Sequence, residues 1–390
     1  EILKGCHYKG GFDTVSIYLQ NNPDSHFFAS KGLILGGSHS PFPLNRNAHC
    51  GDLSAVLLQN LNPLVNLIRV PDKKIILMDE WESKIKAIVE STWKTDVNSL
   101  SGVPSWMLVL IKAVLQKTGS EYLTDVWPNM EVFFHGGISF EPYRDQYKAL
   151  IPSDRMHYME TYNASEGFFG LQDNPEEHSL LLMIDYSVFY EFIPINEVGE
   201  EHPTVLPLEA VEVGKNYAMV ITTSGGLWRY QIGDTVRFTS LYPHKFVISG
   251  RTKNFINAFG EELMVDNADK AISRVCRQTG AKVKEYTAAP LFMLDKAKGR
   301  HQWMIEFEKM PPSLDDFASL LDKTLQQLNS DYEAKRYKEI SLQPLEIRVA
   351  REGTFYEWLR RKGKLGGQHK IPRLSNDRTF IEELGKICDS

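Results

Sequence analysis

The segment GDTVRFTSLYPHKFVISGRTKNF, residues 233–255, contains the change in sequence pattern that decides how we divide the chain. Two short apolar runs within it, at residues 236–238 and 246–248, are typical of strands in a sheet. Helical patterns become frequent after Gly250, so we place a boundary within residues 251–255. The sequence therefore predicts two domains, at residues 1–252 and 253–390, which suits a chain of this length.

Upstream of the boundary, the sequence predicts a large α/β domain. Pro104, followed by apolar residues at spacings of three and four, predicts an amphipathic helix that ends before Gly119. Met107 lies on the apolar face of this helix, where it could line a pocket for an acyl group or simply pack in the core. Glycine-broken apolar runs predict further strands at residues 132–134, 157–162, 180–184, 217–222 and 227–231.

Downstream of the boundary, the pattern predicts a smaller α+β domain. A helix at residues 262–279 is followed by Gly280, which is typical of a helix end. Ser313, with Asp316 three residues later, predicts the start of a second helix with an apolar face. Strands are expected at residues 283–286, 303–307 and 345–349.

The composition favours a water-soluble protein whose partners are small molecules. Hydrophobic residues make up 42% of the chain and charged residues 24%, and the net charge is −6. This charge argues against nucleic acid or an anionic membrane as the main partner, and no apolar run reaches the length of a bilayer. The four cysteines form neither a C-x-x-C pair nor a zinc-ligand pattern, so we expect free thiols and a cytoplasmic location.

Four short segments carry glycine or polar residues where a core strand would carry apolar ones. The first is His135-Gly136-Gly137, where a flat ring could lie close against a backbone that has no Cβ atoms. A turn that needs positive φ is the commoner explanation of such a pair. The other three segments are residues 162–167 (YNASEG), 229–234 (RYQIGD) and 366–373 (GGQHKIPR).

Each of these three segments has one side chain suited to nucleotide chemistry and one ordinary alternative. Tyr162 could stack on a base and Glu166 could bind Mg²⁺, or they could be a structural tyrosine and a solvated loop carboxylate. Asp234 follows a glycine at the end of a strand, where it could accept hydrogen bonds from ribose hydroxyls or belong to a surface turn. Lys370 lies on a glycine-containing loop, where it could neutralise phosphate charge or be an ordinary surface lysine.

Taken in order, Gly-Gly, Tyr-x-Ala-Ser-Glu, Arg-Tyr-x-x-Gly-Asp, Gly-Arg and a late Gln-x-Lys-x-Pro-Arg resemble the acyl-acid amido synthetases of the auxin-responsive promoter family, in a bacterial-type member. That family belongs to the adenylate-forming superfamily, which also holds acyl-CoA synthetases and luciferases. The resemblance extends over essentially the whole chain. It implies a large adenylate-forming N-terminal domain joined by a hinge to a small α+β C-terminal domain.

The resemblance also implies roles for individual residues. Tyr162 would stack on adenine, and Glu166 would be catalytic through Mg²⁺, which it would help to bind. Lys370 would be the catalytic lysine that the small domain brings to the phosphates. The remaining implied positions are Gly136, Gly137, Ala164, Ser165, Asp234 and Arg251 for nucleotide binding, and Lys253 and Asn254 for the hinge.

The implied reaction is ATP-dependent adenylation of a carboxylic acid, followed by transfer of the acyl group to an amine such as an amino acid. His135 is a candidate base for the amine proton, with a structural histidine as the alternative. One departure is that the Ser/Thr/Gly-rich loop that cradles phosphates in the family is absent, so we expect the large domain to be truncated before Glu1. We therefore keep two alternative functions, an acyl-CoA ligase and a catalytically silent nucleotide-binding protein, and expect a monomer or weak dimer.

Overall fold

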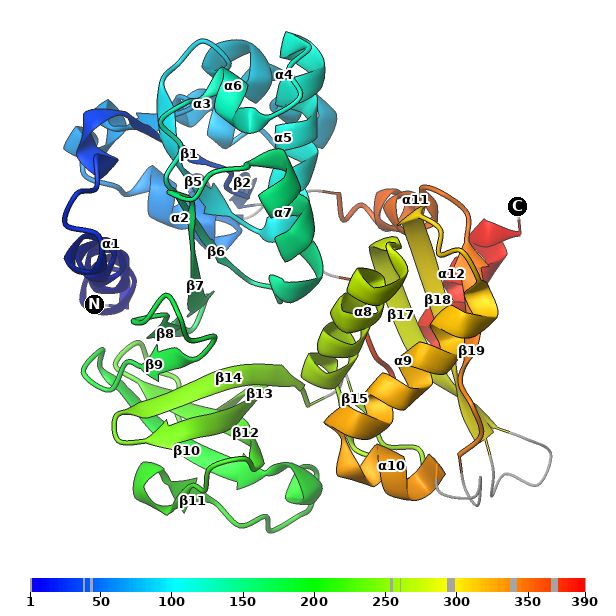
Figure 1. Ribbon diagram of the computed structural model, residues 1–390. Helices are drawn as coiled ribbons and strands as arrows, with labels where there is room; N and C mark the ends of the chain where they lie inside the picture. The colour runs from blue at the N-terminus through cyan, green and yellow to red at the C-terminus, as the bar shows by residue number, and fades with distance from the viewer. Residues whose placement is uncertain are drawn as a thin grey trace.

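The large sheet is the central feature of the N-terminal two thirds of the protein (Figure 1). The computed structural model describes residues 2–37, 39–42, 45–252, 255–259, 261–292, 299–336, 342–365 and 371–389. Within these ranges, twelve strands pair into one continuous sheet. Their spatial order is β11 (Leu206–Pro207), β10 (Val188–Pro194), β12 (Asn216–Thr223), β13 (Tyr230–Leu241), β14 (His244–Arg251), β9 (Leu180–Leu182), β8 (Gly167–Leu171), β7 (His157–Ala164), β6 (Val132–Gly136), β5 (Val97–Gly102), β1 (Lys31–Ile34) and β4 (Arg69–Val70).

One end of this sheet is parallel. Strands β4, β1, β5, β6 and β7 run in the same direction, so their carboxyl ends meet at one edge, where α/β sheets bind ligands. Helices α4 (Trp81–Thr92), α5 (Pro104–Thr118) and α7 (Arg144–Leu150) pack over one face, and α1 (Lys9–Asn21) covers the other. Helix α5 begins with Pro104 and ends at Gly119, which has φ of 70°, as the sequence predicts.

The other end of the sheet is antiparallel and contains the main difference from the predicted strands. The sequence pattern predicts two strands, at residues 227–231 and 236–238, with Asp234 at a strand end. The structure instead has the single strand β13, with three residues (232–234) opposite Met219 of β12 in a bulge. Gly233 takes φ of 84°, which a glycine adopts without strain. Asp234 therefore lies inside a strand, at a bulge that redirects its side chain.

After the large sheet, a three-stranded sheet forms the centre of the C-terminal region. Strands β17 (Lys282–Phe292), β18 (Gly299–Lys309) and β19 (Glu346–Ala350) carry α8 (Val265–Thr279) and α9 (Leu314–Leu328) on one face (Figure 1). Helices α11 (Thr354–Arg361) and α12 (Thr379–Cys388) pack on the other. This mixed fold, with a large sheet and a smaller C-terminal sheet domain, confirms the predicted fold class. The boundary between residues 252 and 253 stays a prediction.

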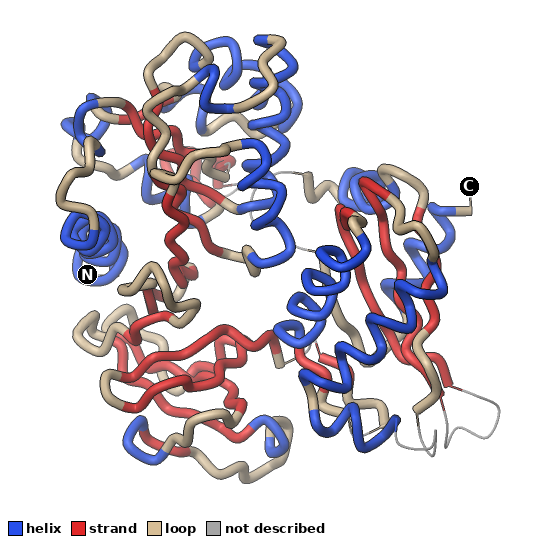
Figure 2. The backbone as a smooth tube through the Cα atoms, viewed as in Figure 1, coloured by secondary structure: helices blue, strands red, loops and turns tan. Residues whose placement is uncertain are grey.

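The predicted start of α9 is also confirmed, because the hydroxyl of Ser313 accepts the backbone N–H of Asp316 at 3.2 Å. The described cysteines Cys6, Cys276 and Cys388 are free thiols. A search of the described helices found none with the length and apolar character needed to cross a membrane. Shorter helices and strands make up the rest of the described elements (Figure 2). They are η1 (Leu3–Tyr8), η2 (Phe27–Ala29), β2 (His39–Phe42), β3 (Asn45–Gly51), α2 (Leu53–Gln59), η3 (Pro63–Leu67), α3 (Lys73–Ile76), α6 (Leu123–Val126), η4 (Glu141–Tyr143), η5 (Ile195–Glu197), η6 (Leu208–Ala210), β15 (Phe255–Ile256), β16 (Leu263–Met264) and α10 (Ser330–Arg336).

A buried carboxylate holds α11 against the small sheet. Glu306 of β18 is 1% exposed and accepts the backbone N–H groups of Gly353 and Phe355 at 2.9 and 3.3 Å. It also pairs with Lys284 at 3.2 Å. The start of α11 therefore depends on a side chain 47 residues earlier in the sequence.

We predict that Glu306→Ala lowers the free energy of unfolding by about 3 kcal/mol, because a buried and a partly buried N–H group lose their acceptor. Urea unfolding followed by circular dichroism measures this change. The matched control is Glu352→Ala, since Glu352 also pairs with Lys284 but its side chain is 87% exposed; we expect a change within about 0.5 kcal/mol. Equal effects of the two substitutions would contradict this role of Glu306.

Candidate active site

A cavity of about 1570 Å³ lies between the carboxyl edge of the parallel strands and the C-terminal domain. Its lining comes from the large sheet on one side and from α8, β17, β18 and α11 on the other. The residues named in the sequence analysis that line it are Gly136, Gly137, Tyr162, Ala164, Ser165, Glu166, Asp234 and Arg251. The structure therefore brings together residues of all four segments that the sequence singles out, the fourth through Ile371, Pro372 and Arg373.

Asp234 connects two other predicted site residues by direct contacts. Its Oδ2 accepts the phenolic O–H of Tyr162 at 2.5 Å, and its Oδ1 pairs with Nε of Arg251 at 3.0 Å. The contact with Arg251 follows from strand pairing, since the two residues are opposite each other on β13 and β14. Burial and the Asp234 carboxylate raise the pKa of Tyr162, so its phenol stays protonated and remains a donor.

The ring of Tyr162 is fixed by its surroundings. Phe169 and Phe246 contact it edge-on, at centroid distances of 5.0 and 6.1 Å. With its hydroxyl bound to Asp234, the ring has little freedom to turn. A rigid aromatic ring in the wall of a cavity is suited to stacking on a flat ligand.

The two glycines at the end of β6 are both required by the backbone itself. A Cβ at Gly136 would lie 2.3 Å from the carbonyl oxygen of Thr161, so the close approach of β6 and β7 needs glycine here. Gly137 takes φ of 85°, which favours glycine. The turn with positive φ thus accounts for Gly137, and contact of either glycine with a base stays a prediction.

The loop after Tyr162 is held in place by the N-terminal helix η1. Nδ1 of His7 lies 2.8 Å from the amide oxygen of Asn163. The carboxylate of Glu166 lines the cavity and is only partly exposed. No described group of three or more acidic, histidine or cysteine side chains is arranged to hold a metal ion. Proteins often hold Mg²⁺ through one or two carboxylates together with phosphate oxygens, and Glu166 is a carboxylate of this kind in the cavity wall.

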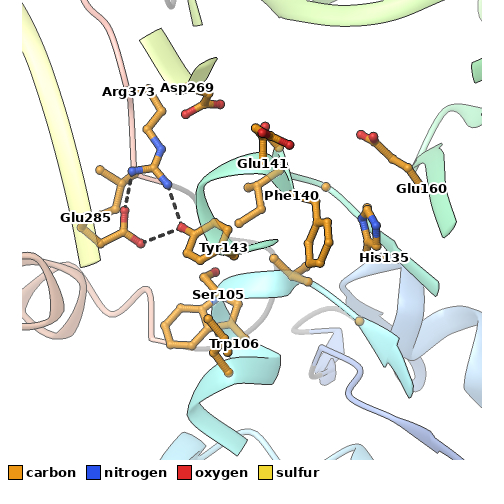
Figure 3. A pocket seen from close by; sticks show the side chains of 18 of the residues that line it. Ser105, Trp106, His135, Phe140, Glu141, Tyr143, Glu160, Asp269, Glu285 and Arg373 are labelled. Carbon is orange, nitrogen blue, oxygen red and sulfur yellow. Dashed lines mark hydrogen bonds and ion pairs between the residues drawn. The ribbon is translucent and has the colours of Figure 1, made fainter. Parts of the chain in front are cut away.

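His135 and Glu160 lie side by side on the floor of the cavity. They are register partners on the parallel strands β6 and β7, and both line the cavity (Figure 3). Burial, with a contribution from Arg144, lowers the pKa of His135 to about 3. Burial raises the pKa of Glu160 to about 7. His135 is therefore a neutral imidazole stacked on Phe140 at 4.2 Å, and a weak base at neutral pH.

A buried polar network joins the C-terminal domain to the large domain beside the cavity. Arg373 pairs with Glu285 at 2.8 Å and donates to the hydroxyl of Tyr143 at 2.7 Å, and Tyr143 in turn donates to Glu285 at 3.3 Å (Figure 3). Tyr143 belongs to the turn η4 of the large domain, whereas Glu285 and Arg373 belong to the small one. The ion pair between Arg373 and Glu285 is mostly buried, so removing either side chain would leave the charge of the other unpaired.

The same turn makes a second contact with the small domain. Glu141 accepts from the hydroxyl of Ser273 at 3.3 Å and pairs with Arg277 at 3.2 Å, both on α8. It also pairs with Arg144, at 3.1 Å. The turn η4 is therefore a docking point for the C-terminal domain in this arrangement.

Met107 is not where the acyl-pocket prediction places it. Its side chain is fully buried on the core-facing side of α5 and does not line the cavity. Its neighbours Trp106 and Val109 do line the cavity. The apolar face of α5 thus serves core packing at Met107, and the pocket prediction for this residue is corrected. The hinge residues Lys253 and Asn254 and the predicted catalytic Lys370 lie outside the described residues.

Sequence reasoning missed three groups that the structure brings to the cavity. Glu160 has the strongest signal that could have been used, because it lies two residues before Tyr162 and so shares its strand face. Arg373 is part of the quoted motif, but nothing in the sequence indicates a partner 230 residues earlier. Tyr143 itself follows Pro142 in an ordinary-looking turn.

Sequence models of three domains of one family match the chain. The GH3 family N-terminal domain matches residues 6–156, the central domain residues 181–251 and the C-terminal domain residues 266–379. Among curated proteins, the indole-3-acetic acid-amido synthetase GH3.4 of Arabidopsis thaliana is 30% identical over 335 residues, or 78% of this chain and 53% of the relative. The 4-substituted benzoates-glutamate ligase GH3.12 of Arabidopsis thaliana is 27% identical over 347 residues, or 79% and 59%.

Solved structures share the fold at lower identity. The GH3.15 acyl acid amido synthetase superposes with a TM-score of 0.75 at 17% identity, over 96% of this chain and 75% of the other. A 2-hydroxyisobutyryl-CoA ligase gives a TM-score of 0.57 at 12% identity, over 93% of this chain and 69% of the other. The chain spans about half the length of the curated relatives it matches. The three domain matches, in the order that the motifs predict, show that the chain belongs to the GH3 family.

Proposed function

We propose that this protein uses ATP and Mg²⁺ to convert a carboxylic acid into an acyl adenylate, and then transfers the acyl group to an amine, an amino acid, to form an amide. The observation that carries the proposal is the contact of Asp234 with Tyr162 and Arg251 at the edge of the cavity. It places a stacking ring, an acceptor for hydroxyls and a cation next to each other. Curated GH3 relatives named as amido synthetases and ligases support the same reaction class.

The nucleotide would be held by its base and its ribose. Adenine would stack on Tyr162 near Gly136 and Gly137, with the Ala164–Ser165 backbone nearby. The carboxylate of Asp234 would accept hydrogen bonds from the ribose hydroxyls, and Arg251 would orient that carboxylate. These roles use side chains whose positions are already fixed by the packing described above.

Glu166 would hold Mg²⁺ together with the phosphates of the nucleotide. When bound, the ion would neutralise charge that develops on the phosphate during attack by the carboxylic acid. Lys370 would add a positive charge at the same phosphate. The acyl group would lie against apolar cavity residues at the start of α5, where Trp106 and Val109 replace Met107 as lining residues.

The nearest rival is an acyl-CoA ligase, and shared fold does not decide between the two, because the chain resembles solved structures of both kinds. We expect pyrophosphate release that depends on an added carboxylic acid. Mass spectrometry of products, with CoA and a panel of amino acids offered separately, identifies the acceptor. A CoA thioester as the sole product would exclude the amide assignment, and no acid-dependent pyrophosphate would favour a catalytically silent nucleotide-binding protein.

We predict that Asp234→Ala weakens AMP binding about tenfold to a hundredfold, because the ribose loses a charged acceptor and Tyr162 loses its anchor. Isothermal titration calorimetry measures the affinity. Tyr162→Phe should have a smaller effect, since it removes only the hydroxyl. The matched control is Asp185→Asn, at an acid whose side chain is 64% exposed, and it should bind AMP as the wild type does. Unchanged affinity in Asp234→Ala would refute the ribose assignment.

Lys370→Ala should lower turnover by at least about a hundredfold while AMP affinity changes less than threefold, because this lysine would act on the transition state and not on the bound nucleotide. Steady-state pyrophosphate release and calorimetry give the two quantities. Lys364→Ala, six residues away and exposed, is the charge-matched control. A loss of AMP affinity equal to the loss of turnover would assign Lys370 to binding instead.

A further inference from the structure

Glu160 is a cavity carboxylate that none of the proposed steps uses. It lies near the middle of β7, on the same face as Tyr162 and roughly 7 Å before it along the strand. Across the floor, its register partner on β6 is His135, directly before Gly136. Gly136 is opposite Thr161, so Glu160 lies next to the proposed glycine contact and two residues before the proposed stacking ring.

The carboxylate of Glu160 has no hydrogen bond or ion pair with any residue in the described part of the chain. Its backbone is fully engaged, since the N–H donates to the side chain of Gln172 at 3.0 Å and the carbonyl accepts the N–H of Gln172 at 2.9 Å. The strand is thus firmly held, while the side chain points into the cavity without a partner (Figure 3). The side chain is partly exposed within the cavity, so a ligand group that bonds to the carboxylate would replace solvent there.

The surroundings favour the neutral form of this carboxyl group. Burial raises the pKa of Glu160 to about 7, with Asp266 of α8 raising it further and Arg144 of α7 lowering it. The other facing group, His135 of β6, is already neutral at this pH because its own pKa is about 3. A protonated carboxyl offers one O–H donor and one carbonyl acceptor.

We propose that Glu160 is the residue that recognises adenine, by accepting a hydrogen bond from the 6-amino group of the base and donating one to the adjacent ring nitrogen. Side-chain amides read adenine through the same paired donor and acceptor. A base stacked on Tyr162 and lying near Gly136 turns an edge toward Glu160, because Glu160 is the next residue on that strand face. This assignment rests on the proposed nucleotide-binding function and adds the residue that sets its base specificity.

The same carboxyl group could instead take the proton of the acceptor amine. The position of Glu160 on the strand argues against this role. Along the proposed nucleotide, Asp234 lies at the ribose, Tyr162 at the base and Glu160 beyond Tyr162. Glu160 is therefore on the side of the base. A substitution separates the two roles, since Glu160→Gln keeps a donor and an acceptor of the same shape but cannot accept a proton.

The test compares AMP with purine riboside 5′-monophosphate, which lacks only the 6-amino group, by calorimetry at pH 6.5 and 8.5. At pH 6.5 we expect the wild-type protein to bind AMP about tenfold more tightly than the analogue. At pH 8.5 the ratio should persist, because the Glu160 carboxylate still accepts from the 6-amino group. Both ligands should bind more weakly there in the wild type, but not in Glu160→Gln, because deprotonation of Glu160 removes the donor to the ring nitrogen. Taking the ratio cancels titration of the phosphate, of His178 and of other groups that affect both ligands equally.

Two substitutions at Glu160 give different expected ratios of AMP affinity to analogue affinity. Glu160→Gln should keep the tenfold ratio at both pH values, and Glu160→Ala should give a ratio near one at both. Circular dichroism melting confirms that each variant is folded. The proposal is overturned if the wild-type ratio is within twofold, or if Glu160→Ala keeps the full ratio.

Two further outcomes bear on the amine-proton role of Glu160 and on the proposed function. If Glu160→Gln binds AMP normally but loses amide formation, and Glu160→Ala keeps the full ratio, Glu160 takes the amine proton and the adenine assignment is wrong. If the wild-type protein binds neither AMP nor the analogue, the proposed function itself fails and the assignment of Glu160 with it. Equal binding of the two ligands refutes only the role of Glu160.

Discussion

The carboxylate of Asp234 makes the contacts on which the geometry of the candidate site depends. It bonds to Tyr162 of β7 and to Arg251 of β14, so one side chain fixes the relative positions of three strands at the cavity. The contact is possible because the bulge at Gly233 turns Asp234 out of the regular alternation of β13. Without that bulge, the aromatic ring, the carboxylate and the cation would not face the same space.

The second constraint is the attachment of the C-terminal domain. Tyr143 and Glu141, two residues apart in one short turn, bind Arg373, Glu285, Ser273 and Arg277 of the small domain. A few directional polar contacts of this kind define one orientation sharply, since each depends on direction and distance. Water can replace these polar contacts if the two domains separate. The interface is therefore specific, but it does not merge the two domains into one hydrophobic core.

The sequence predicted those parts of the fold that depend on local signals. Helix α5 was predictable because Pro104 and Gly119 favour its two ends, and α9 because Ser313 caps its first turn. The bulge in β13 was missed, because Gly233-Asp234 looks like a surface turn unless the partner strand is known. The capping of α11 by Glu306 was also invisible, since the two segments are distant in sequence and meet only after the sheet forms.

The same reasoning applies to the site. The order of motifs identified Tyr162 and Asp234, because their residue types and spacing are distinctive when taken together. Glu160 carries no such signal, because a polar residue in a half-buried strand is common. Its interest comes from its position in the cavity wall without a partner among the described residues, which only the folded chain shows. Met107 is the opposite case, since an apolar residue at helical spacing suits a pocket and a core equally, and packing decided for the core.

The distribution of charge around the cavity suggests how a nucleotide would be oriented. At neutral pH, His135 and Glu160 on its floor carry together only part of one negative charge, because His135 is neutral and burial raises the pKa of Glu160 to about 7. Its rim carries ionised groups with access to water, including Arg251, whose side chain is 52% exposed. An uncharged base can be buried on such a floor at little desolvation cost, whereas phosphates cannot. The polarity of the cavity therefore favours one direction of entry, with the base inward and the phosphates toward the rim that faces the C-terminal domain.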